Sequence, residues 1–294
     1  MMKKITSEKV FSVCNVIFLL VFAITCVYPF YYMLIYSFSN PSEAYKITIL
    51  PVGFTLDNYR KAIEVAGIGR ATIVSVLRTV IGTVVTVSCC SFFGYLVTKQ
   101  RMVGRKLIYR LLVVTMYVDG GLIPTYMVMN AYGLNNSYWM YILPTALSAY
   151  NVMLIKTFTE QLPPALEESA MIDGAGAIRC WRSVVLPLSK PILATIAVFS
   201  AVAQWNAWFD AHIYMIDSEK WSLQYVLYRF LKQVASLAKA MEDANFGIDQ
   251  GMVVMTPDTV RMTITAMVTL PILFVYPFMQ RYFMKGMLLG AVKG

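Results

Sequence analysis

Residues 10–38 read VFSVCNVIFLLVFAITCVYPFYYMLIYSF, a run of 29 residues with no charged side chain. At about 1.5 Å rise per residue, this run is long enough to cross a hydrocarbon core of about 30 Å as one helix. Lys3, Lys4 and Lys9 precede it, as they would in a signal peptide. The run is too long for the apolar core of such a peptide, and no small-x-small cleavage site follows it. We therefore expect a retained first span.

The same pattern recurs along the chain. Residues 79–98 and 262–280 carry no charge, 111–155 carry only Asp119, and 191–216 supply a further apolar block. A turn-rich stretch at 132–137 divides the longest of these blocks into two spans. We expect an all-α membrane protein with a single domain over 1–294, a cytoplasmic loop at 159–189 and six spans, at about 10–38, 70–98, 107–130, 138–158, 190–214 and 260–283.

Composition agrees with a membrane protein. Hydrophobic residues make up 58% of the chain, charged residues 14%, and the mean hydropathy is +0.61, whereas a soluble domain of this length needs more charge to cover its surface. The five cysteines lie in or beside apolar segments without metal-ligand spacing, so we expect neither a metal site nor a redox function.

The net charge of +9 is unevenly distributed. The N-terminus, the loops 99–110 and 156–190 and the C-terminus hold 15 Lys and Arg against 5 Asp and Glu, whereas 39–70 and 217–261 hold 9 of each. A basic surplus confined to alternate loops is the positive-inside pattern, which predicts that both termini are cytoplasmic. A basic face beside anionic membrane lipid explains the surplus, so we expect no nucleic-acid partner.

The stretch 162–191 reads LPPALEESAMIDGAGAIRCWRSVVLPLSKP. Its two leading prolines suit the first turn of a helix, and Glu167 and Glu168 follow where carboxylates complement the helix dipole. Gly174 and Gly176 break this helix, and Pro187 ends a second one. The pattern predicts a short helix–turn–helix outside the membrane. An ordinary hairpin at the membrane interface would show the same sequence pattern.

This stretch resembles the EAA loop of ABC-importer permeases, in which Glu-Ala-Ala, three residues, Gly and nine further residues precede Ile-x-Leu-Pro. Glu168-Ser169-Ala170, Gly174 and Val184-Val185-Leu186-Pro187 stand at these positions, with serine for one alanine and valine for the isoleucine. Stretches 120–126, 205–209, 223–227 and 280–294 are similar to carbohydrate-uptake permeases of the LplC type, related to maltose-type inner-membrane permeases. The resemblance covers nearly the whole chain and implies the MetI-like permease fold with a cytoplasmic coupling helix.

The resemblance also implies partners. It implies a bacterial plasma-membrane importer in which this chain pairs with a second permease to form the pathway, above two ATPase subunits. An extracellular or periplasmic binding protein would deliver a carbohydrate, either an oligosaccharide or a polysaccharide fragment, to surfaces that include 39–70 and 215–259. The chain has no Gly-x-x-x-x-Gly-Lys-Ser/Thr sequence, so we expect it to bind no cofactor, with ATP and Mg on the ATPase partner. The residues implied in ATPase coupling are Glu167, Glu168, Ser169, Ala170, Asp173, Gly174, Leu186 and Pro187.

Asp119 is a candidate for the solute path because carboxylates within spans are costly and usually face a cavity or a partner. Gly120, Gly121 and Pro124 follow it, so the third span is expected to be interrupted there. A structural carboxylate paired with a neighbour such as Arg78 is the alternative.

Aromatic and amide side chains in the fourth and fifth spans are further candidates, since sugars offer apolar faces rimmed by hydroxyls. Interfacial anchoring is the alternative for the aromatic residues, and hydrogen bonding between helices is the alternative for the amides. We expect His212, at the end of a span, to be interfacial. The stretch that begins at Trp221 has the spacing of an amphipathic surface helix, which either caps the bundle or docks an external partner. The path candidates in these two spans are Tyr150, Asn151, Gln204, Trp205, Asn206 and Trp208.

Two other classes of membrane protein also fit a chain with six spans. A secondary transporter would usually show internal repeats and several charges within its spans, and no repeat is visible. A membrane scaffold would need none of the glycine and proline breaks or polar positions in the third to fifth spans. No hydrolytic constellation is visible, so we expect no catalytic residues and a transport subunit rather than an enzyme.

Overall fold

The computed structural model describes residues 2–41, 43, 49–65, 67–243 and 259–274. Within these ranges the regular secondary structure is helical, with no strand. The chain divides into two compact units, Met1–Ala66 with Arg229–Leu270 and Gly67–Tyr228 with Pro271–Gly294. Helix α12 (Leu223–Asp243) begins in the second unit and continues into the first.

The first unit contains α1 (Met2–Ser37), α2 (Asp57–Val65) and most of the helix Thr259–Phe274. From Glu8 to Tyr31 the side chains of α1 are exposed on all sides, although most are apolar. Such a surface is stable only when lipid or a partner covers it. The buried Asn58 amide ties α2 to the end of α1 by donating to the carbonyl oxygens of Ser37 and Ser39 at 2.9 and 2.8 Å.

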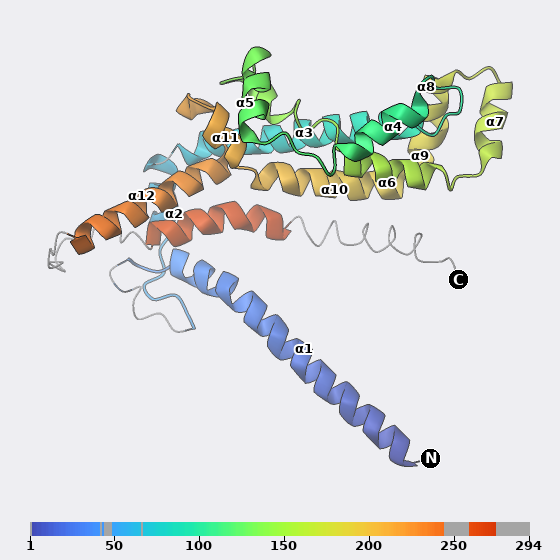
Figure 1. Cartoon of the computed structure of the whole chain (residues 1–294). Coiled ribbons are helices and arrows are strands. Elements are labelled where there is room, and N and C mark those ends of the chain that lie inside the picture. Colours follow the sequence, from blue (N-terminus) through green and yellow to red (C-terminus); the bar gives the residue numbers. More distant parts are fainter. Residues whose placement is uncertain (1, 42, 44–48, 66, 244–258, 275–294) are drawn as a thin grey trace. The chain divides into compact units, whose positions relative to one another are not determined.

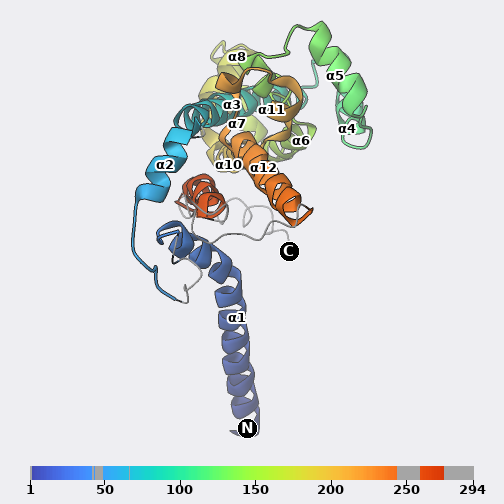
Figure 2. The ribbon, with the colours of Figure 1, turned by 90° about the vertical axis from the view of Figure 1, so that its left-hand side faces the viewer.

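The second unit is built on α3 (Ile68–Leu96). Helices α6 (Ala149–Thr159) and α10 (Lys190–Asn206) pack along it, as Figures 1 and 2 show from the side and from the end. Gly94 allows the close approach of α6, because a Cβ there would lie 2.8 Å from Ile155 Cγ2. Small residues at such crossings are typical of helices packed in membranes.

Several expected spans are interrupted. The region 107–130 forms α4 (Arg105–Val114) and α5 (Leu122–Ala131), separated by non-helical residues that include Asp119. The region 138–158 begins with the 3-10 turn η2 (Tyr138–Tyr141), and α6 starts only at Ala149. The region 190–214 forms α10 and, after a break at 207–208, α11 (Phe209–Tyr214).

Among the described residues, two helices, Glu8–Ser37 and Ile68–Leu96, are long and apolar enough to cross a membrane by themselves. A third candidate is the pair Ala177–Leu188 and Lys190–Asn206, which meet at an angle of 85°, and Thr259–Phe274 is a shorter apolar helix. The helical fold class is therefore established for the described residues, whereas the number of six spans stays a prediction.

The segment between α6 and α10 forms the expected hairpin of helices. Helix α7 (Pro164–Ile172) is followed by α8 (Ala177–Cys180), the π-helical turn η3 (Trp181–Val185) and α9 (Leu186–Leu188). Figure 1 shows α7 at the outer end of the second unit, beyond α8 and α9. We refer to residues 163–187 as the coupling hairpin, after the role that the sequence predicts for them.

Candidate translocation cavity and coupling hairpin

Gly174 ends α7 with a backbone conformation that favours glycine. Its φ is +79°, its N–H donates to the Met171 carbonyl at 3.0 Å, and the N–H of Ala175 donates to the Ala170 carbonyl at 2.9 Å. These two bonds form a Schellman cap, in which a residue with a β-carbon is strained. Gly174 is thus required for the turn itself, whatever it contacts.

The hairpin is fixed to the end of α3 by charge and by packing. Lys99 forms an ion pair with Glu167 and lies over the Tyr95 ring, 4.2 Å from its centroid. Trp181 meets Phe92 edge to face, with ring centroids 5.1 Å apart. The hairpin is therefore in direct contact with the end of α3.

The predicted coupling residues divide into two groups. Glu167 and Ala170 face the rest of the unit, because Glu167 pairs with Lys99 and Ala170 packs against the cluster of Tyr95, Cys180 and Val185. Leu186 is half-buried. The residues left exposed for a partner are Glu168, Ser169, Asp173, Gly174 and Pro187.

Sequence reasoning missed Ile172 at the tip of the hairpin. Its side chain is 86% exposed, and Met171 beside it is 44% exposed. A large aliphatic side chain exposed outside the apolar blocks is a candidate anchor for a protein contact. The signal in the sequence was an Ile between Met171 and Asp173 in a loop expected to lie outside the membrane.

A cavity of about 660 Å³ lies beside α3, α6 and α10. Three of the predicted path residues, Tyr150, Asn151 and Gln204, line it together. The cavity is also lined by residues other than these three, among them Arg78, Thr86, Thr145, Phe199, Ser200 and Asp210.

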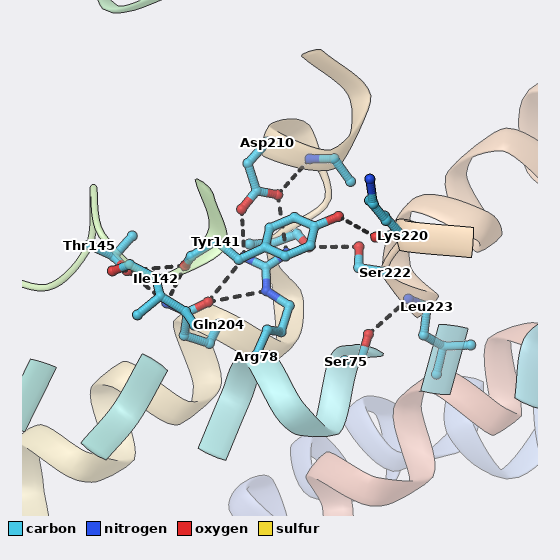
Figure 3. A network of polar contacts seen from close by, with 12 residues as sticks. Ser75, Arg78, Tyr141, Ile142, Thr145, Gln204, Asp210, Lys220, Ser222 and Leu223 are labelled. Carbon is cyan, nitrogen blue, oxygen red and sulfur yellow. Dashed lines mark hydrogen bonds and ion pairs between the residues drawn. The ribbon is translucent and has the colours of Figure 1, made fainter. Parts of the chain in front are cut away.

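Arg78 is the centre of the polar network at this cavity (Figure 3). Its side chain is 2% exposed, and its Nη2 lies 2.5 Å from Oδ2 of Asp210. Nη1 donates to Asp210 Oδ1 at 3.2 Å and to the Ala207 carbonyl at 3.3 Å, while Nε and Nη2 donate to Gln204 Oε1 at 3.1 and 3.0 Å. The guanidinium also lies 4.1 Å from the centroid of the Tyr141 ring. The network thereby joins α3 to the broken end of α10 and to α11.

Gln204 links three segments of the unit. Besides accepting from Arg78, it donates through Nε2 to the Tyr141 carbonyl at 3.0 Å and to Thr145 Oγ1 at 2.7 Å. Gly82 on α3 makes room for it, since a Cβ there would lie 2.7 Å from Nε2. Hydrogen bonding between helices is therefore confirmed for this amide, which also lines the cavity, whereas its contact with a solute stays a prediction.

The other predicted path residues lie outside this cavity. The Asp119 side chain is exposed and accepts from the Gly121 N–H at 3.0 Å. Its suggested pairing with Arg78 is wrong, because Arg78 pairs with Asp210.

In the fifth region, Trp208 stacks on Tyr228 with centroids 4.1 Å apart, and Asn206 accepts from Gln224 Nε2 at 3.2 Å. Trp205 is half-buried, and none of these three side chains lines the cavity. Their roles in a solute path stay predictions.

A charge inventory could have found the central pair. Once the charges of the termini and loops are set aside, Arg78, Asp119 and Asp210 remain within the regions expected to span. One cation and two anions leave one acid without a partner, and spacing alone does not show which. The choice depends on the break after Asn206, which the sequence did not reveal.

At the end of the second unit remote from the hairpin, Asn136 organises a small polar surface. Its amide donates to Asp217 Oδ2 at 2.7 Å, and Lys220 Nζ lies 2.9 Å from the same carboxylate. The hydrogen bonds from Lys220 and Asn136 lower the pKa of Asp217. Asn136 adopts φ of +55°, a conformation that asparagine tolerates better than most residues.

Apolar helices, a cavity with apolar walls and a few polar groups beside them, and a helical hairpin beyond their end form the arrangement expected of a membrane transport subunit. No protein-family model matches the chain. The chain is 40% identical over 280 residues to the polygalacturonan/rhamnogalacturonan transport system permease protein YtcP of Bacillus subtilis, covering 94% of this chain and 96% of that protein. It is also 40% identical over 288 residues to protein LplC of the same organism, covering 97% and 96%.

A solved structure agrees. A bacterial ABC transporter involved in the import of the acidic polysaccharide alginate has a chain that superposes with a TM-score of 0.83 at 26% identity, covering 94% of this chain and 98% of that one. The chain belongs to the family of carbohydrate ABC transporter permeases, which are transport components and not enzymes. A permease of this kind works in a membrane with a partner permease, an ATPase and a binding protein.

Proposed function

We propose that this chain is one of two different permease subunits of a bacterial carbohydrate importer, with six spans, both termini in the cytoplasm and the pathway at the interface of the two permeases. The identity to YtcP along nearly the whole chain is the observation that carries the proposal. The distribution of Lys and Arg supports the orientation, since the basic loop 99–110 and the coupling hairpin share the end of α3 at which Lys99 pairs with Glu167.

The coupling hairpin would dock on one of two ATPase subunits, which bind ATP and Mg and drive the transport cycle. Three features support this role: an exposed aliphatic tip at Ile172, exposed polar residues beside it, and a firm attachment to α3 through Lys99 and Trp181. A docked hairpin that is tightly joined to α3 can convert closure of the ATPases into movement of the spans.

The solute would be an oligosaccharide or a fragment of a polysaccharide. The cavity combines exposed aromatic rings, at Tyr150 and Phe199, with the amides of Asn151 and Gln204. Small-molecule sites typically combine apolar walls with a few convergent polar groups in this way. A relative that imports neutral sugars by its name, the melibiose/raffinose/stachyose import permease protein MelC of Bacillus subtilis, is 26% identical over 287 residues.

A binding protein outside the cell would deliver this solute to external surfaces that include 39–70 and 215–259. The polar surface around Asn136, Asp217 and Lys220 lies at the end of the unit opposite the hairpin and supports this arrangement. Asp119, Trp205, Asn206 and Trp208 stay candidates for path contacts in other states of the cycle.

The experiment is reconstitution of the chain with its candidate partner permease and ATPase into proteoliposomes, with the candidate binding protein added outside. We expect uptake of radiolabelled oligosaccharide that requires ATP inside the vesicles and is lost when this chain is omitted. Uptake without ATP, driven by an imposed proton gradient, would instead identify a secondary transporter and refute the proposal.

A further inference from the structure

The charge of the cavity is internally compensated. Its charged lining residues, within the described part of the chain, are Arg78 and Asp210. A guanidinium has five N–H donors, and the five hydrogen bonds to Gln204, Asp210 and the Ala207 carbonyl account for all of them. Arg78 therefore has neither an uncompensated charge nor an unused donor to offer a solute.

The groups that remain for a solute are uncharged. The side-chain amide of Asn151 makes no hydrogen bond to any described residue, although its backbone N–H donates to Ser148 Oγ at 3.5 Å. The hydroxyl oxygen of the buried Ser200 has no partner among the described residues either. Tyr150 and Phe199 line the same cavity with rings that belong to residues 47% and 39% exposed. An amide offers two donors and an acceptor, which suits hydroxyls that both donate and accept.

We infer that this cavity receives an uncharged sugar ring, and that Asp210 determines this preference by compensating the charge of Arg78. The inference rests on the proposed function and names the solute chemistry of this one site. A carboxylate entering the cavity would lose its hydration without gaining a cation. Any acidic unit of the solute would therefore be bound outside this cavity, even though two of the similar proteins are named for acidic polysaccharides.

The first test measures the electrostatic potential at the cavity directly. Asn151→Cys is made in the complete transporter, in a background where the exposed cysteines Cys14, Cys26 and Cys89 are replaced by serine. Its rates of modification by a negatively charged and a positively charged methanethiosulfonate are compared with those of a small free thiol. We expect the ratio of the rate with the negative reagent to the rate with the positive reagent to be the same for the cysteine at 151 and for the free thiol. Adding Asp210→Asn, which leaves the charge of Arg78 uncompensated, should favour the negative reagent by about tenfold.

The second test uses two trisaccharides that differ only at C6, galactotriose and trigalacturonate, as protecting agents. The neutral trisaccharide should slow modification of Asn151→Cys, the acid should not, and Asp210→Asn should allow the acid to protect. A preference for the negative reagent with Asp210 intact, an unreactive cysteine, protection by the acid, or protection by neither sugar would each overturn the inference.

These outcomes are separable from the proposed function. A transporter that takes up its solute with ATP but shows a positive potential at this cavity would refute the neutral site and leave the permease assignment intact. The variant Asp210→Asn could fail to assemble. In that case the reagent ratio and the protection pattern measured with Asp210 in place still distinguish a neutral cavity from a positive one.

Discussion

Replacing Arg78 with methionine removes the cation of a buried ion pair and is expected to destabilise the protein strongly. Methionine fills similar space without charge, so Asp210 is left without a cation and Gln204 Oε1 loses both of its donors from Arg78. Breaking a buried pair by removing one partner costs about 3–5 kcal/mol. Because the Asp210 side chain is 21% exposed, we expect the lower end of this range, about 3 kcal/mol.

The assay is the thermal unfolding midpoint of the purified complex in detergent at one heating rate, since unfolding of such a complex is irreversible. At about 2–4 °C per kcal/mol for a domain of this size, Arg78→Met should lower the midpoint by about 6–12 °C. Adding Asp210→Asn should restore part of the loss, because no unpaired charge remains.

Arg70→Met is the matched control. Arg70 lies on the same helix and pairs with Glu219 at 2.8 Å, but the two side chains are 57% and 64% exposed. Such a surface pair contributes about 0–1 kcal/mol. If Arg78→Met unfolds at the same temperature as Arg70→Met, the claim that the Arg78 pair holds this unit together is refuted.

Three further predictions follow from other contacts. Gly94→Ala should destabilise the protein by about 1–3 kcal/mol, because the new Cβ would lie 2.8 Å from Ile155 Cγ2 and 3.2 Å from the Val152 carbonyl oxygen. Gly69→Ala is the control, since a Cβ at Gly69 meets nothing within 4 Å. Equal unfolding midpoints for the two variants would contradict this prediction. Lys99→Gln should raise the rate of hydrogen–deuterium exchange in α7 by roughly fivefold, because losing the ion pair with Glu167 removes about 1 kcal/mol of stability. Lys156→Gln breaks the ion pair with Glu160 instead and should leave exchange in α7 unchanged. The lowered pKa of Asp217 means that its ionised form stabilises the fold above about pH 4 and that this contribution disappears as the pH falls through the folded pKa. Asp217→Asn should therefore unfold at a lower temperature than the wild type at pH 7 and at the same temperature as the wild type in acid. A difference in unfolding temperature that does not depend on pH would contradict this assignment.

The sequence predicted the elements that depend on local signals. Long uncharged runs predicted α1 and α3, and the prolines and glycines of 162–191 predicted the hairpin, because these features act within one or two turns of helix. The glycines after Asp119 predicted an interruption of the third span, and the chain is non-helical there before α5.

The elements that depend on contacts between distant segments were not predictable. Asp210 reaches Arg78 across 132 positions of sequence, and only the break between α10 and α11 brings it there. Ala170 and Glu167 were expected to face a partner, yet their burial depends on how α7 packs against the end of α3. The helical periodicity of a sequence shows which face of a helix each residue occupies, but it does not show which neighbouring element packs on that face.

The central claim is that the hairpin couples this permease to a separate ATPase, and substitution at its exposed tip tests it most directly. Ile172→Arg should release the ATPase during purification of the complex, or leave it bound with hydrolysis that no longer responds to loaded binding protein. Val103→Arg is the matched control, since Val103 is 91% exposed in the loop that leaves the same end of α3 but lies outside the hairpin. Ile172 is preferable to Gly174 for this purpose, because any side chain at Gly174 would disturb the cap of α7. We expect Val103→Arg to retain the ATPase and its stimulation. An Ile172→Arg complex that assembles and responds like the control would contradict the assigned role of the hairpin.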